Sequence, residues 1–212
     1  MLVVDRFGLD RQYGANTYVL RATDASGEAV VVDPGGDPAP LLAALASEQI
    51  TMAAILVTHC DVDHIGGVAD LAAATGAPVW APVGEAYRLR EGRTRGGMSV
   101  APHDPEYVVG DGDRIDVGGV SFEVVGVAGH SEDHIAFAHE GEIFAGDLLF
   151  AGSVGRVDLP GGDWQALLDS VSRLLTRYGP DAVVYPGHGG PTRLGHELAS
   201  NPFLGELRAA AQ

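Results

Sequence analysis

Cysteine and positive charge are both scarce in this sequence of 212 residues, and long apolar runs are absent. The single cysteine, Cys60, can form no disulfide within the chain and no thiolate cluster, so any metal must be bound by histidine and carboxylate side chains. No apolar run approaches the ~20 residues that span a bilayer. The N-terminus also lacks a basic leader with a small-residue cleavage site. These absences predict a cytoplasmic protein without a membrane partner.

The net charge of −16, with only 13 basic residues, repels phosphate backbones and argues against nucleic acid as a partner. One local exception is a run of four arginines: Arg88, Arg90, Arg93 and Arg95. They lie in segment 85–105, whose polar and glycine-rich composition predicts a surface excursion or lid. The arginines either attract an anionic small-molecule substrate or form a solvated charged face. The sequence does not predict the oligomeric state.

Short runs of β-branched residues bounded by turn residues predict strands, and longer alanine- and leucine-rich stretches predict helices. Asp37 and Pro38 open one helix as a cap followed by a proline in the first turn. A continuous apolar run predicts a strand buried on both faces at 53–57. The remaining expected strands are 17–20, 29–32, 114–117, 120–127, 135–138, 143–145 and 182–185, and the expected helices are 37–48, 68–74 and 163–177.

The elements run as strands then helices, twice over, with no linker between the halves. A length of 212 residues requires no second domain, so we expect one domain over 1–212. Two such halves can pack sheet against sheet with helices on the outer faces, which is a four-layer α/β/β/α sandwich of two mixed sheets. Periodicity alone does not select this α/β layout over others.

The densest group of polar side chains directly follows the buried strand 53–57. It reads Thr58-His59-Cys60-Asp61-Val62-Asp63-His64 and offers four metal-ligand side chains within six positions. Imidazole and carboxylate suit Zn, Fe or Mn, and a loop at a strand end can turn them toward one point. A solvated polar turn is the alternative interpretation. We expect Cys60 to be buried as a small apolar side chain.

Further ligand-type residues follow later strands, each beside glycine: His130, Asp147 and His188. Any one of them is accounted for by a hydrogen-bonded turn. Their recurrence at the ends of several strands predicts one convergent metal site.

The ordered motifs HxDxDH (59–64), Gly129-His130, Gly146-Asp147 and Gly187-His188-Gly189 resemble those of the metallo-β-lactamase superfamily, whose first motif is usually HxHxDH. Segments 146–150 and 152–162 and the ending Asn201-Pro202-Phe203 are similar to the short glyoxalase II-like (hydroxyacylglutathione hydrolase-like) branch. The sequence ends before the helical region with which glyoxalase II enzymes bind glutathione, which argues against glutathione thioesters.

The resemblance implies one or two divalent ions, Zn, Fe or Mn. Its ligand sets would be His59, Asp61 and His130 for one site and Asp63, His64 and His188 for the other, with Asp147 bridging. It also implies hydrolysis of a small thioester or ester by a metal-bound hydroxide, with Asp63 and Asp147 as catalytic residues. Substrate contacts are expected from His134 and Arg156, although an ion pair between Arg156 and Asp158 is the preferred role for that arginine.

Asp61 departs from the usual motif. Its carboxylate either ligates a metal, or stops short of the metal and holds a water molecule or a hydrogen bond to a group behind the ligands. Two other functions remain open. Persulfide dioxygenases share the fold and hold a single iron with the equivalents of His59, His130 and Asp147, two histidines and one carboxylate. A metal-poor binding protein that has lost catalysis through Asp61 is the third possibility.

Overall fold

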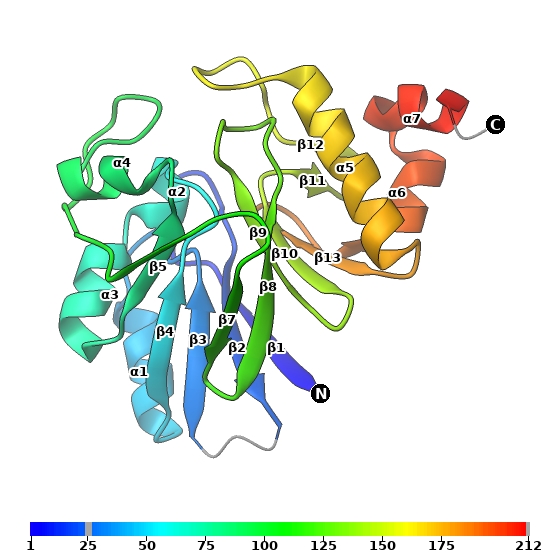
Figure 1. The fold of residues 1–212 in the computed structure, drawn as a ribbon. Helices are drawn as coiled ribbons and strands as arrows, with labels where there is room; N and C mark the ends of the chain where they lie inside the picture. Colours follow the sequence, from blue (N-terminus) through cyan, green and yellow to red (C-terminus); the bar gives the residue numbers. More distant parts are fainter. Residues whose placement is uncertain (24–26, 211–212) are drawn as a thin grey trace.

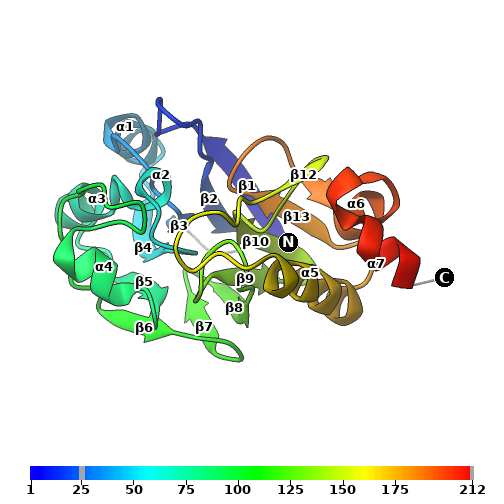
Figure 2. The same cartoon turned by 90° about the horizontal axis from the view of Figure 1, so that it is seen from above.

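The computed structural model describes residues 1–23 and 27–210, which form two six-stranded sheets packed face to face between two sets of helices. Figure 1 shows the helices of the N-terminal half on one outer face and those of the C-terminal half on the other. Viewed from above, the order helix, sheet, sheet, helix is plain (Figure 2). The expected four-layer sandwich of two mixed sheets is confirmed.

The first sheet has the order β1-β2-β3-β4-β5-β6, antiparallel up to β3 and parallel from there on. Its strands are β1 (Leu2–Phe7), β2 (Thr17–Ala22), β3 (Glu28–Val32), β4 (Thr51–Leu56), β5 (Val79–Pro82) and β6 (Tyr107–Val109). Its helices are α1 (Ala39–Ser47), α2 (Val62–Ile65), α3 (Val68–Thr75) and α4 (Ala86–Glu91).

The second sheet has the order β14-β13-β10-β9-β8-β7, with β10 and β13 parallel and the other neighbours antiparallel. Its strands are β7 (Arg114–Val117), β8 (Val120–Gly126), β9 (Ile135–His139), β10 (Glu142–Gly146), β13 (Val183–Pro186) and β14 (Thr192–Arg193). A separate hairpin joins β11 (Leu149–Phe150) and β12 (Ser153–Val154). The helices are α5 (Trp164–Tyr178), α6 (Leu194–Ser200), the 3₁₀ turn η1 (Pro202–Leu204) and α7 (Gly205–Ala210).

Side-chain alternation along the strands divides the apolar residues among three cores. In β2, Tyr18 and Leu20 point between the two sheets, whereas Val19 points toward the helices of the first half. Successive side chains of a strand face opposite sides, so a strand covered on both faces needs apolar residues throughout. Phe122 and Phe137 of the second sheet fill the core between the sheets.

Segment 85–105 differs from the expected surface excursion. It contains α4, which buries Ala86 and Leu89 against the first sheet, and it also buries Glu85 and Arg95. The apolar residues of α4 are spaced as one helical turn, a pattern too short to outweigh the polar composition around it. Within the described residues, no helix has the length and apolar character needed to cross a membrane.

Candidate metal centre

The expected ligands come together at one edge of the sandwich, where strands of both sheets end. His59 and Asp61 follow β4, whereas Asp63 and His64 lie on the single turn of α2. From the second sheet come residues after β8, β10 and β13, namely His130, Asp147 and His188. Carboxyl ends of neighbouring parallel strands meet at one edge, which is why residues far apart in the sequence become neighbours.

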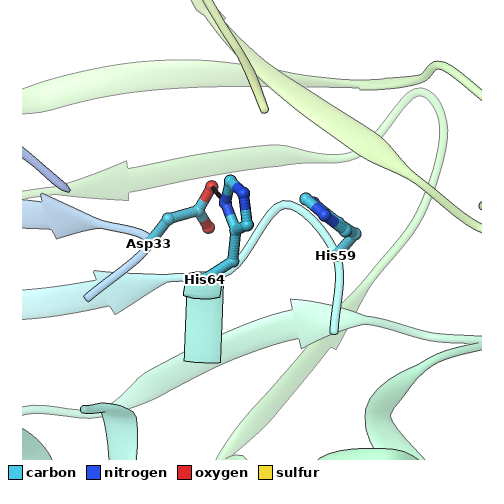
Figure 3. Close-up of side chains that lie close together, drawn as sticks. All are labelled: Asp33, His59 and His64. Carbon is cyan, nitrogen blue, oxygen red and sulfur yellow. Dashed lines mark hydrogen bonds and ion pairs between the residues drawn. The ribbon is translucent and has the colours of Figure 1, made fainter. Parts of the chain in front are cut away.

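Asp33, directly after β3, organises two of the histidines. Its carboxylate accepts hydrogen bonds from the Thr58 amide at 2.8 Å and from the Thr58 hydroxyl at 2.6 Å. It also accepts from His64 Nδ1 at 2.9 Å (Figure 3). The Thr58 hydroxyl gives its only proton to Asp33, so it accepts from His59 Nδ1, 3.0 Å away. Both rings therefore turn Nε2 toward the centre of the site.

His130 is oriented in the same way by a main-chain acceptor. Its Nδ1 donates to the Arg156 carbonyl at 2.7 Å, which leaves Nε2 as the nitrogen that faces the other ligands. A metal-ligating histidine commonly donates its second ring N–H to a carboxylate or carbonyl, which sets the tautomer. His59, His64 and His130 each follow that arrangement.

Six of the seven side chains form two groups of possible ligands, each with donor atoms within 4.8 Å of one another. We call His59, Asp61 and His130 the first donor group, and Asp63, His64 and His188 the second donor group. Asp147 stands between them: its Oδ2 is 3.4 Å from His188 Nε2 and 3.8 Å from His130 Nε2.

The second donor group has spacings suited to a metal. Oδ2 of Asp63 is 3.2 Å from His188 Nε2 and 3.9 Å from His64 Nε2, and Asp147 Oδ1 is 3.2 Å from His64 Nε2. Ligand atoms about 2.1 Å from one tetrahedral ion lie about 3.4 Å apart. Nitrogen and carboxylate oxygen are also the donor types that zinc, iron and manganese accept.

Among the expected ligands, three buried atoms have no hydrogen-bond partner: His59 Nε2, His64 Nε2 and Asp147 Oδ1. A buried polar atom without a partner is costly, and several aimed at one point indicate a ligand. The backbone leaves room for them, because a Cβ on Gly187 would lie 2.1 Å from Asp147 Oδ1 and 2.6 Å from the His64 ring. The donor set and the shape of the site therefore fit a divalent metal.

Burial and neighbouring charge displace the pKa values of these residues. Burial, followed by the charge of His64, holds the pKa of His59 well below its ordinary value, so its ring is neutral and its lone pair is free. Hydrogen bonds to Asp147 and Asp63 raise the pKa of His188 to about 9. For Asp61, burial alone would raise the pKa, but the neighbouring His130 ring and the Arg95 guanidinium hold it at about 2. The Asp61 carboxylate is thus ionised over the physiological range.

Arg95 belongs to the site, although the sequence predicted that it would lie in a surface segment with the other three arginines. The four arginines of 88–95 do not form one charged face: Arg90 is exposed in an ion pair with Asp104, whereas the Arg95 side chain is 1% exposed and bonded to Asp61. A lone arginine in a polar segment carries no sign of burial in its sequence. Its partner, a carboxylate at the end of a distant strand, is visible only in the structure.

A cleft of ≈ 270 Å³ opens over the donor groups. Its other lining residues include Tyr13, Met98, Arg156 and Leu159. The side chains of Arg156 and Asp158 form the expected ion pair at 2.7 Å and are exposed at 60% and 66%.

His134 is placed differently. It lies behind His59, with ring centroids 4.7 Å apart, and it lines a second cavity of ≈ 390 Å³ that contains none of the expected ligands. Arg156 therefore lines the cleft, whereas His134 does not.

Two residues that hold the expected ligands in place were not predicted from the sequence. Asp33 was expected only as part of a turn, yet it is buried with φ of 52°, a conformation that costs energy in any residue but glycine. Glu85, buried at the start of α4, accepts from the Cys60 amide at 2.8 Å and from the Ser131 hydroxyl, and so ties the two ligand loops together. The Asp-Pro-Gly-Gly sequence after a buried strand was the one available signal for Asp33. Cys60 is fully buried, as expected.

A family model described as the metallo-beta-lactamase superfamily matches residues 10–188. The hydroxyacylglutathione hydrolase GloC of Haemophilus influenzae is 30% identical over 189 residues, which cover 85% of this chain and 89% of that protein. The crystal structure of the BLEG-1 B3 metallo-beta-lactamase superposes with a TM-score of 0.87 at 33% identity, covering 96% of this chain and all of the other. TTHA1623, solved in a di-iron-bound form, superposes with a TM-score of 0.80 at 36% identity, covering 95% and 100%.

Proposed function

Since the chain belongs to the metallo-β-lactamase superfamily, a family of metallo-hydrolases, we propose that it hydrolyses a small thioester or ester at a metal centre in this cleft. The residues that would hold metal are those of the second donor group, Asp63, His64 and His188, together with Asp147. The similarity to a hydroxyacylglutathione hydrolase supports the thioester class. The di-iron form of TTHA1623 supports iron as one of the ions to be tested, beside zinc and manganese.

The observation that carries the proposal is the set of buried atoms without partners, His59 Nε2, His64 Nε2 and Asp147 Oδ1, beneath an open cleft. A divalent ion at such donors supplies Lewis acidity and lowers the pKa of water to around 7. The chain supplies the rest. Asp63 and Asp147 line the cleft and are the carboxylates available to accept a proton from the attacking water.

The cleft limits the size of the substrate. Its volume of ≈ 270 Å³ is just below the ~300 Å³ from which pockets for drug-sized molecules begin. Tyr13, Met98 and Leu159 provide apolar surface at its rim, and Arg156 provides an exposed positive charge. A short acyl group with an anionic or polar thiol suits this lining. Glutathione thioesters belong among the candidates, because GloC is a protein of similar length.

The test is a hydrolysis screen of chelator-treated protein reloaded with zinc, iron(II) or manganese in turn. Lactoyl-glutathione, acetyl thioesters of small thiols and aryl acetates are the substrates, with release of thiol or phenol measured. We expect metal-dependent hydrolysis of at least one thioester. The Asp147→Ala variant should lose this activity and most of its metal, whereas Asp169→Ala, an exposed acid on α5, should retain both. Absence of hydrolysis with every metal and substrate would refute the proposal.

The persulfide dioxygenase alternative is tested in the same preparations by oxygen consumption with a persulfide. The iron of a persulfide dioxygenase is held by two histidines and one carboxylate, and here His130 Nε2 would have to be free to bind it. That atom lies 3.0 Å from Nη2 of Arg95. This contact favours hydrolysis over the alternative.

A further inference from the structure

Arg95 lies between α4 and β6 and reaches into the first donor group rather than into solvent. Its guanidinium meets Asp61 side by side: Nε is 3.1 Å from Oδ1 and Nη2 is 2.6 Å from Oδ2. This paired geometry is the strongest form of arginine–carboxylate contact. Both oxygens of Asp61 are thereby engaged by a fixed cation.

The same guanidinium also engages His130. Nη1 donates to the His130 carbonyl, and Nη2 lies 3.0 Å from His130 Nε2. Because His130 Nδ1 donates to the Arg156 carbonyl, Nε2 carries the lone pair and accepts from Nη2. The atom with which His130 would bind a metal is therefore directed at Arg95.

We propose that the Arg95 guanidinium is the resident cation of the first donor group, so that the centre holds a single metal ion, in the second donor group with Asp147. The proposal rests on the metal centre of the proposed function and specifies its stoichiometry and its charge. Arginine stays protonated at any pH the protein meets, so this positive charge is permanent. It would lie beside the metal.

Geometry and charge both oppose a second ion at this position. With Asp61 and His130 bonded to Arg95, only His59 and the shared Asp147 remain to coordinate it, fewer than the three protein ligands of a catalytic zinc site. Withdrawing Arg95 would leave a guanidinium that is now 1% exposed without its carboxylate, and removing one partner of a buried pair is strongly unfavourable. The usual histidine at position 61 could not neutralise a guanidinium, whereas aspartate does. Asp61 and Arg95 are thus complementary in charge.

The test counts metal ions and does not depend on activity. Metal-free protein is dialysed against chelator-buffered Zn²⁺, and zinc per chain is measured by plasma mass spectrometry. Titration with Co²⁺, followed by visible absorption, provides an independent count. We expect one tightly bound ion per wild-type chain and two in Arg95→Met, which frees Asp61 and His130. Arg93→Met, an exposed arginine two residues away, is the matched control and should bind one.

Two tightly bound ions per wild-type chain would overturn the inference, and this result needs no variant to fold. A folded Arg95→Met protein that still binds one ion would also overturn it. If Arg95→Met does not fold, the double variant Asp61→His with Arg95→Met supplies the three-histidine set, and a second ion is expected there. A wild-type chain that binds no metal would instead refute the metal centre of the proposed function, which separates that failure from this one.

Discussion

Asp33 shows at the scale of a single residue how the site is prepared. One buried carboxylate accepts bonds from Thr58 and from His64, and through the Thr58 hydroxyl it also sets the ring of His59. It touches no part of the cleft. Its effect on metal binding therefore acts through the orientation and basicity of the two histidines.

We expect Asp33→Asn to weaken metal binding by about 10–100-fold, the usual effect of removing a carboxylate behind a ligating histidine. The amide keeps an acceptor for the Thr58 groups but no longer has the charge that supports the His64 ring. Competition with a chromophoric chelator measures the change. Asp37→Asn, an exposed aspartate a few residues on, should leave the affinity unaltered. Equal metal affinities for the wild type and both variants would show that Asp33 does not support metal binding through the histidines.

Glu85 gives a residue-scale prediction about pH. Burial raises the pKa of this carboxyl above its ordinary value of 4.5, although bonds from Ser131 and the Cys60 amide oppose the change. A folded pKa above the unfolded one means that the folded state binds the proton more tightly, so stability falls as pH rises past 4.5 toward the raised value. Glutamine at this position accepts the same bonds without a charge. As pH rises, the wild type should therefore lose stability relative to Glu85→Gln. The unfolding free energy of the variant minus that of the wild type should increase.

Urea unfolding of the metal-free proteins at pH 5 and pH 8 measures this difference. Glu85→Ala is the companion variant: it leaves the Cys60 amide and the Ser131 hydroxyl without their acceptor and should cost about 1–3 kcal/mol. A Glu85→Gln variant whose relative stability is the same at both pH values would contradict the assigned pKa direction.

At the scale of elements, the loop after β13 brings His188 to the site, and it passes so close to the other ligands that only glycine fits at its start. A Cβ on Gly187 would lie 2.1 Å from Asp147 Oδ1, whereas a Cβ on Gly190 would meet nothing within 4 Å. Asn16 holds the same loop by donating from its side chain to the carbonyls of Pro186 and Gly189 at 2.9 Å each.

We expect Gly187→Ala to push Asp147 and His64 apart and to reduce bound metal below one ion per chain. Gly190→Ala should bind metal as the wild type does, since the same methyl group there has free space. Metal content after gel filtration measures both variants, and circular dichroism establishes that they are folded. Full metal occupancy in Gly187→Ala would contradict this prediction, because it would show that the loop can move to accommodate the methyl group.

At the scale of the whole molecule, the donor groups join the two halves of the sandwich. His59, Asp61, Asp63 and His64 come from the first sheet, and the other three expected ligands come from the second. An ion bound only by the folded state stabilises it by about 2.7 kcal/mol at a free concentration of 100 Kd. In a chain of this size, each kcal/mol shifts Tm by roughly 2–4 °C.

Chelation should therefore lower Tm by about 5–10 °C, and readdition of zinc should restore it. Differential scanning calorimetry at several metal concentrations measures the shift. Arg93→Met should show the same dependence as the wild type. A Tm independent of metal would mean that the ion contributes nothing to joining the halves.

The sequence by itself determined most of the strands and helices and the residue types of the candidate ligands. Alternation of apolar residues and the buried run 53–57 predicted most strands correctly, because burial on one or two faces leaves a period of two or a continuous apolar run. Ligand residues at strand ends were recognisable, because histidine and aspartate beside glycine recur there. Short elements such as β5, β6 and α4 were not predicted, since a single helical turn or a four-residue strand is too short for a periodic pattern.

Only the tertiary structure decided which side chains support the ligands and which compete with a metal for them. Asp33 and Glu85 act through hydrogen bonds to segments 25 or more residues away, and Arg95 pairs with a carboxylate 34 residues before it. Such contacts depend on how loops from different strands meet at the sheet edge, and a polar residue in a loop has the same sequence pattern whether it is buried or solvated. The physical reason is that partner choice for a polar group is a matter of three-dimensional proximity, whereas strand and helix formation leaves a local periodicity that the sequence records.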